Sequence, residues 1–152
     1  MRITRHQMFQ EIAQVVAKRS TCFREAVGAI VVKNDRVISM GYNGPKAGAP
    51  HCTHHPDGQC TESIHAEDNA IRFLKGKAMI NCDLYCTHLP CPRCTYLITS
   101  SGYFSRVFFS VVYGDVAAIE EAFNSAGIKL YRILPSGVIT TPDRKVILND
   151  VE

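Results

Sequence analysis

Hydrophobic and polar residues follow two different periods along the chain. Over residues 3–18 the apolar positions recur every three or four residues, which is the spacing of an amphipathic helix. Residues 26–32 are small and β-branched, Asn34-Asp35 is a turn signal, and residues 36–40 alternate between apolar and polar. These segments predict a β-hairpin that follows the first helix.

Regular periodicity stops between residues 41 and 63, where Gly, Pro, His and Cys are frequent. A loop of this length inside one domain is usually functional, or is ordered by something other than a hydrophobic core. We therefore interpret 41–63 as an insert loop that a metal ion orders.

Helices and strands alternate after this insert. We predict helices over 64–74, 91–100 and 116–126, and strands over 83–87, 106–110 and 128–133. A hairpin followed by alternating helices and strands favours an α/β fold, a three-layer α/β/α sandwich with a mixed five-stranded sheet. At 152 residues the chain is expected to form a single domain over 1–152, with a C-terminal tail over 135–152.

Composition and charge narrow the classes of partner. Hydrophobic residues make up 46% of the chain and charged residues 20%, which is enough to bury a core. The formal charge of +3 comes without long basic runs, which disfavours nucleic acid as a partner. No apolar stretch approaches the roughly 20 residues of a membrane span, and the first residues lack a signal-peptide pattern. We expect a cytoplasmic protein (host cytoplasm if the source is a virus) with no membrane partner.

Seven cysteines and six histidines indicate metal binding, because a reducing cytosol does not sustain a disulfide framework. Cys91 and Cys94 are three residues apart at the start of a predicted helix, so they share one face. The helix N-terminus stabilises thiolates, the form that zinc requires. His65 opens the preceding helix and supplies a third ligand. Three protein ligands with one open position are typical of catalytic zinc.

Glu67 lies two residues beyond the predicted histidine ligand. A carboxylate at this position can take a proton from a zinc-activated water and return it to the reacting group. The alternative is an ordinary zinc knuckle at Cys91 and Cys94, with His65-x-Glu67 arising by coincidence. The two motifs together, in this order, match the signature of zinc-dependent nucleobase deaminases.

The chain resembles the deoxycytidylate (dCMP) deaminase family over residues 18–133. The motifs that carry the resemblance are Ser20-Thr-Cys22, Val27-Gly-Ala-Ile-Val-Val32, Gly41-Tyr-Asn-Gly44, His51-Cys52, Ile64-His-Ala-Glu-Asp-Asn-Ala70 and Thr87-His-Leu-Pro-Cys-Pro-Arg-Cys94. The resemblance implies a cytidine deaminase-like fold and the hydrolysis of dCMP to dUMP and ammonia, a reaction that feeds thymidylate synthesis. It also implies that His65, Cys91 and Cys94 bind the catalytic Zn²⁺ and that Glu67 is the proton shuttle.

The resemblance assigns substrate contacts as well. The backbone N–H of Ala66 would face the pyrimidine carbonyl, Asn43 the deoxyribose, and Tyr113 with Ser110 the 5′-phosphate. Arg24 is a candidate phosphate clamp, because a guanidinium can bind two phosphate oxygens at once. The alternatives are a half-buried aromatic at the end of a strand for Tyr113 and a solvated loop residue for Arg24.

A second set of ligands comprises Cys22, Cys52, Cys60 and either His55 or His54. Three cysteines and a histidine complete a tetrahedral zinc site, and one ion could order the insert loop. Members of the family carry a comparable structural zinc. The alternative is three reduced thiols beside solvent-facing histidines. Cys82 and Cys86 lie at or in a predicted strand and are expected in the core.

The same resemblance implies a homohexamer that dCTP activates and dTTP inhibits. The effectors would bind with Mg²⁺ near Gly41, Tyr42, Asn43 and Gly44. Other functions remain open: a deaminase of dCTP or deoxycytidine, a tRNA adenosine deaminase, and a non-catalytic zinc module for protein interaction.

Overall fold

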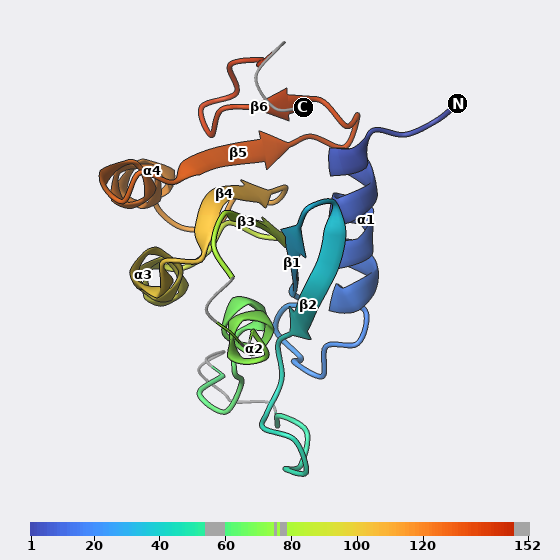
Figure 1. Cartoon of the computed structure of the whole chain (residues 1–152). Coiled ribbons are helices and arrows are strands. Elements are labelled where there is room, and N and C mark those ends of the chain that lie inside the picture. Colours follow the sequence, from blue (N-terminus) through green and yellow to red (C-terminus); the bar gives the residue numbers. More distant parts are fainter. Residues whose placement is uncertain (54–59, 75, 77–78, 148–152) are drawn as a thin grey trace.

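The computed structural model describes residues 1–53, 60–74, 76 and 79–147. The elements of these residues are, in chain order, α1 (Arg5–Ala17), β1 (Gly28–Lys33), β2 (Arg36–Tyr42), α2 (Ala66–Arg72), β3 (Cys82–Cys86), α3 (Pro92–Ser101), β4 (Phe104–Phe109), α4 (Val116–Ser125), β5 (Lys129–Ile133) and β6 (Ile139–Thr140) (Figure 1).

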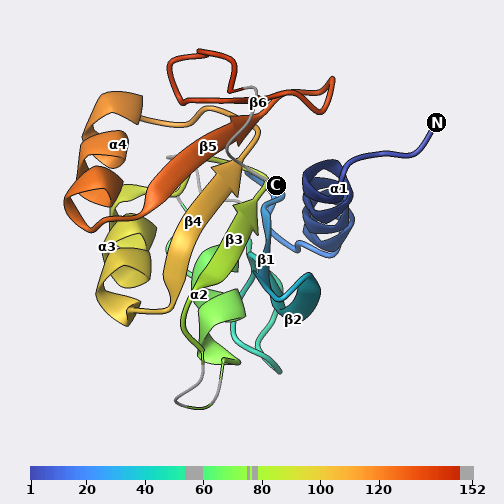
Figure 2. The same ribbon diagram turned by 45° about the horizontal axis from the view of Figure 1, so that its top comes forward.

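The strands form one mixed sheet in the order β2-β1-β3-β4-β5-β6. β1 is antiparallel to both β2 and β3, whereas β3, β4 and β5 run parallel. α1 covers one face of the sheet and α2, α3 and α4 cover the other, as Figures 1 and 2 show. The predicted α/β/α sandwich is therefore confirmed.

The sheet has six strands where five were predicted. The additional strand, β6, has two residues and pairs antiparallel with the end of β5. It lies inside the predicted tail 135–152. Two residues are too few to produce an alternating pattern, so the sequence held no local signal for this strand.

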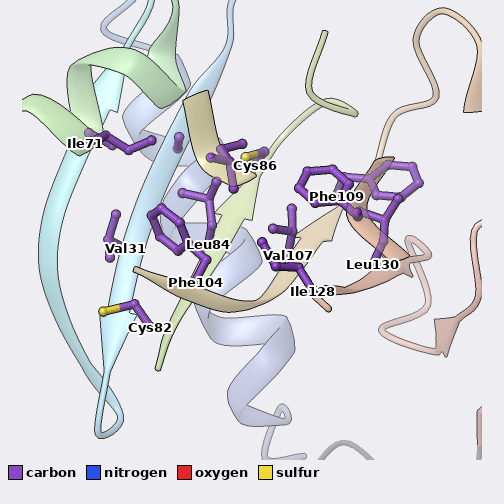
Figure 3. Packing of buried hydrophobic residues seen from close by; sticks show 14 of the residues in the cluster. Val31, Ile71, Cys82, Leu84, Cys86, Phe104, Val107, Phe109, Ile128 and Leu130 are labelled. Carbon is purple, nitrogen blue, oxygen red and sulfur yellow. The ribbon is translucent and has the colours of Figure 1, made fainter. Parts of the chain in front are cut away.

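The alternation of side chains along the strands separates two hydrophobic clusters. On the α1 side, Ile30 and Val32 of β1 pack with aromatic residues of β3 and β4. On the other side, Val31 packs with residues of β3, β4 and α2 (Figure 3). Cys82 and Cys86 are fully buried in this second cluster, which confirms them as core residues.

Two close approaches fix the start of α2 against the edge of the sheet. A Cβ on Gly41 of β2 would lie 2.4 Å from the Ala66 carbonyl oxygen and 2.5 Å from the Ala70 nitrogen. Ser39, on the same strand, donates a hydrogen bond from Oγ to the Ala70 carbonyl at 2.6 Å. Only glycine fits at position 41, and the first turn of α2 is held in a defined place.

The candidate site lies where β3 leaves the sheet. The segment after β3 runs beside the segment after β4, since the Leu89 N–H donates to the Val111 carbonyl and the Val111 N–H to the Thr87 carbonyl, both at 2.9 Å. The carboxyl ends of parallel strands are where open α/β sheets place ligands. In the part of the chain described, no helix is long and apolar enough to cross a membrane.

Candidate active site

His65, Cys91 and Cys94 converge at the N-terminal ends of α2 and α3. The Nδ1 atom of His65 lies 3.4 Å from Cys91 Sγ and 3.3 Å from Cys94 Sγ. All three ligand atoms lie within 4.8 Å of one another, and across the described ranges this is the one His, Cys, Asp or Glu group of this kind. The structure thus brings together the three predicted zinc ligands.

The start of α3 favours a thiolate at Cys91. Cys91 is the N-cap of α3, and its sulfur accepts a hydrogen bond from the Cys94 N–H at 3.5 Å. Hydrogen bonds from the Cys94 thiol, from His65 and from this N–H lower the pKa of Cys91 to about 4, although burial opposes the shift. The hydrogen bond with Cys91, together with burial, raises the pKa of Cys94. The start of α3 thus favours a thiolate at Cys91, and a divalent cation would displace the proton that stays on Cys94.

Glu67 is a buried carboxylic acid beside these ligands. Its residue is 4% exposed, and its Oε2 accepts a hydrogen bond from Cys94 Sγ at 3.5 Å. Burial raises the pKa of Glu67 above its usual range. A carboxyl group with a raised pKa holds a proton more readily than an ordinary one, which is the property that a group acting as both general base and acid needs.

These residues open into a cavity of about 380 Å³. The predicted substrate contacts Arg24, Asn43, Ala66 and Tyr113 line this cavity. Ser110 is not among the lining residues, and its carbonyl oxygen instead accepts a hydrogen bond from Arg132 Nε at 3.1 Å. The side chains predicted from distant parts of the sequence therefore surround one space, with Ser110 outside it.

Asn43 connects the cavity wall to the loop before β1. Its Oδ1 accepts hydrogen bonds from Ser20 Oγ at 2.6 Å and from the Val27 N–H at 2.9 Å. Its Nδ2 donates to the Glu25 carbonyl at 2.7 Å. Because Asn43 is 8% exposed and makes these three contacts, it fixes the loop that carries Arg24.

Several other residues line the cavity without a role predicted from the sequence, namely Glu25, Val27, Ser63, His88 and Leu89. His88 and Leu89 lie inside the Thr87–Cys94 motif, so that motif held a signal for them. The sequence around Glu25 held no such signal, because the position of Glu25 at the cavity depends on the loop that Asn43 fixes.

In the second cysteine set, Cys60 is the thiol that contacts both of the others. Cys60 forms side-chain hydrogen bonds with Cys52 and with Cys22. Although burial opposes it, these bonds and the N–H groups of Glu62 and Ser63 lower the pKa of Cys60, whereas burial and Cys60 raise that of Cys52 to about 11. The two histidines proposed as the fourth ligand, His54 and His55, lie outside the described residues.

A second cavity, of about 430 Å³, lies on the other side of the Gly41–Gly44 segment. Gly41, Tyr42 and Gly44 line this cavity, together with the basic residues Lys46 and Arg72. Asn43 lines the first cavity instead. The segment predicted to bind effectors therefore separates two cavities.

Several known proteins are similar to this chain over most of its length. The model of the cytidine and deoxycytidylate deaminase zinc-binding region matches residues 3–111. ComE operon protein 2 of Bacillus subtilis is 35% identical over 138 residues, covering 87% of this chain and 72% of that protein. The deoxycytidylate deaminase of Mycobacterium phage D29 is 38% identical over 112 residues, covering 63% of this chain and 87% of that protein.

The solved structures include the dCMP deaminase of cyanophage S-TIM5 in complex with dCMP and dUMP. It superimposes with a TM-score of 0.77 at 28% sequence identity, covering 87% of this chain and 98% of that one. The mixed sheet, the His/Cys/Cys group and the matched family model agree with one another. The chain belongs to the zinc-binding cytidine and deoxycytidylate deaminase family.

Proposed function

We propose that this protein catalyses the hydrolytic deamination of dCMP to dUMP and ammonia, and so feeds thymidylate synthesis. The observation that carries the proposal is the buried Glu67 carboxyl beside His65, Cys91 and Cys94, at a cavity of a size usual for small ligands. The likeness to a cyanophage dCMP deaminase solved with dCMP and dUMP supports this choice of substrate.

The three convergent side chains fit a catalytic zinc ion. One imidazole nitrogen and two thiolate sulfurs are a donor set that catalytic zinc uses, and a fourth position is left for the reacting water. His65, Cys91 and Cys94 would hold the ion, whose Lewis acidity activates this water for attack on C4 of cytosine.

Glu67 moves the protons of the reaction. Its carboxylate takes a proton from the attacking water and delivers it to N3 of the base, and the second proton of the same water then passes to the amino group. The C4–O bond forms, the C4–N bond to the amino group breaks, and ammonia leaves. The raised pKa of Glu67 suits a group that must accept and return protons in one cycle.

The other proposed contacts orient the nucleotide in the cavity. The backbone N–H of Ala66 faces the pyrimidine carbonyl and Asn43 the deoxyribose. Arg24 and Tyr113, which line the same cavity, bind the 5′-phosphate. Arg24 is exposed, and Tyr113 is 50% exposed, so both can reach a group that enters from solvent.

The substrate is tested by measuring ammonia release from dCMP, dCTP, deoxycytidine and an adenosine-containing tRNA hairpin, on protein of known zinc content. We expect dCMP to give the highest kcat/KM, because the cavity holds both the proton shuttle and the phosphate donors. If dCTP, deoxycytidine or the hairpin is turned over preferentially, that molecule and not dCMP is the substrate. No turnover by zinc-loaded protein would favour a zinc module for protein interaction.

We further propose a second, structural zinc ion bound by Cys22, Cys52, Cys60 and His55 or His54. Three facts support it: Cys60 is hydrogen-bonded to both other thiols, Cys52 is 1% exposed, and the lowered pKa of Cys60 favours a thiolate. This ion would hold the insert loop against the loop before β1.

Regulation by nucleoside triphosphates is proposed for the second cavity. Lys46 and Arg72 bring basic groups to this cavity that suit a triphosphate with Mg²⁺, and Arg72 is also ion-paired with Asp68 at 2.7 Å. Asn43, between Tyr42 and Gly44, contacts the loop that carries Arg24, so an effector beside this segment can change the first cavity.

This proposal predicts cooperative kinetics in a homohexamer. Velocity should depend sigmoidally on dCMP, become hyperbolic with dCTP, and fall with dTTP, and light scattering should give six times the chain mass. Kinetics that neither effector changes would contradict the regulatory proposal, and a monomer mass would contradict the hexamer. We place the reaction in the cytoplasm, where reduced thiols such as the free cysteines described here persist.

A further inference from the structure

The imidazole of His88 is fixed to the sheet on one side. Its Nδ1 lies 2.8 Å from Thr87 Oγ1. That hydroxyl also accepts a hydrogen bond from the Gly28 N–H, at the start of β1, at 3.1 Å. Thr87 is 5% exposed, so the anchor is buried, and His88, which lines the cavity, has its other nitrogen, Nε2, left for a second partner.

The Nε2 atom of His88 faces an exposed carboxylate. It lies 3.3 Å from Glu25 Oε1. An ionised carboxylate only accepts hydrogen bonds, so this contact requires a hydrogen on Nε2. The His88 side chain is 15% exposed and that of Glu25 is 61% exposed. Glu25 can therefore turn into solvent without leaving a buried group unpaired.

Two further donors line the same cavity beside His88. Arg24 is the chain neighbour of Glu25, and Tyr113 follows the segment that runs beside His88. The backbone bonds between Val111 and both Thr87 and Leu89 hold that segment in place. A guanidinium, an imidazole N–H and a phenol thus line one cavity, and phosphate oxygens accept hydrogen bonds from all three groups.

We propose that His88 Nε2 binds the 5′-phosphate of the nucleotide, and that Glu25 occupies this donor until the phosphate replaces it. The inference rests on the proposed function, since it requires a nucleotide substrate. It gives the two residues opposite effects. His88 strengthens the binding of a phosphate, and Glu25 weakens it because its negative charge competes with the phosphate for the same N–H.

The test replaces His88 with leucine and measures KM for dCMP, together with Ki for the product dUMP and for deoxyuridine, which has no phosphate. We expect KM for dCMP and Ki for dUMP to rise about 10- to 100-fold, the loss for one hydrogen bond to a charged group. Ki for deoxyuridine should change less than about twofold, and kcat should change much less than KM.

Two variants separate binding from folding. His88→Gln retains an N–H donor on a side chain of similar length and should recover part of the affinity for dUMP. Glu25→Gln removes the competing charge and should lower Ki for dUMP below the wild-type value. Zinc content and thermal unfolding, measured on each variant, show that the fold persists.

The possible failures are distinct. If the wild-type protein does not turn over dCMP, the proposed function fails and the role of His88 fails with it. If the wild type deaminates dCMP but His88→Leu raises Ki for dUMP and deoxyuridine by the same factor, the phosphate contact is refuted and the proposed function stands. An increase in Ki for dUMP in Glu25→Gln would overturn the competing role of Glu25.

Discussion

Replacing Glu67 with glutamine is expected to lower kcat for dCMP by about 10²- to 10⁴-fold, the usual contribution of a general acid and base. Glutamine has nearly the same shape but cannot carry the proton from the attacking water to the base. Glu67 is not among the three convergent ligands, so the variant should keep its zinc. Steady-state kinetics and metal analysis of the same preparation measure both quantities.

The stability of this variant provides a second readout. Glu67 is 4% exposed, and a carboxyl group in such surroundings is costly to ionise. A neutral amide removes that cost, so the melting temperature of Glu67→Gln should equal or exceed that of the wild type. Glu121→Gln, at an exposed position of α4, is the matched control and should change neither property. Near-normal turnover by zinc-loaded Glu67→Gln would refute the shuttle role.

The order of helices and strands could be predicted because each element carries a local signal. The turn Asn34-Asp35 illustrates this. Both residues have positive φ, 49° and 58°, as the tight hairpin between β1 and β2 requires, and Asn and Asp are the residue types that tolerate it. β6 has no comparable signal, because its two residues depend on pairing with β5.

The convergence of His65 with Cys91 and Cys94 was also predictable, because each motif opens a helix and the helices follow neighbouring parts of one sheet. Their role in binding zinc stays a prediction. The residues of the cavity wall were harder to predict from the sequence. Glu25 and His88 are 63 residues apart, and their contact depends on how the loop before β1 packs against the end of β3.

The predicted phosphate contact of Ser110 stays a prediction, although Ser110 is not among the residues that line the cavity. Tyr113, three residues later, lines the cavity, whereas Ser110 directly follows β4, and its backbone carbonyl oxygen accepts a hydrogen bond from Arg132. A family motif identifies residues by their order along the chain and not by their positions in space. The direction of each side chain at the end of a strand is set by pairing with neighbouring strands, which the motif does not contain.

Replacing Cys52 with serine is expected to remove one of two zinc ions per chain and to destabilise the fold. Cys52 is 1% exposed and hydrogen-bonded to Cys60, so its replacement removes a buried ligand of the proposed zinc site. We expect a cost on the order of 3 kcal/mol, only part of the binding free energy of structural zinc, because the two hydrophobic clusters do not depend on this loop. For a domain of this size, that cost lowers the melting temperature by about 6 to 12 °C.

Cys82→Ser is the matched control for this experiment. Cys82 is also fully buried, but it belongs to the hydrophobic cluster that Figure 3 shows, which includes none of Cys22, Cys52 and Cys60. Serine there places a hydroxyl in an apolar cluster, where the thiol donates only a long hydrogen bond of 3.9 Å to the Ile80 carbonyl, so it should lower the melting temperature and keep both zinc ions. Zinc content therefore separates the two variants even where their stabilities agree. Two zinc ions in Cys52→Ser, or a single ion in the wild-type protein, would refute the proposed structural site. The three thiols would then be ordinary reduced cysteines.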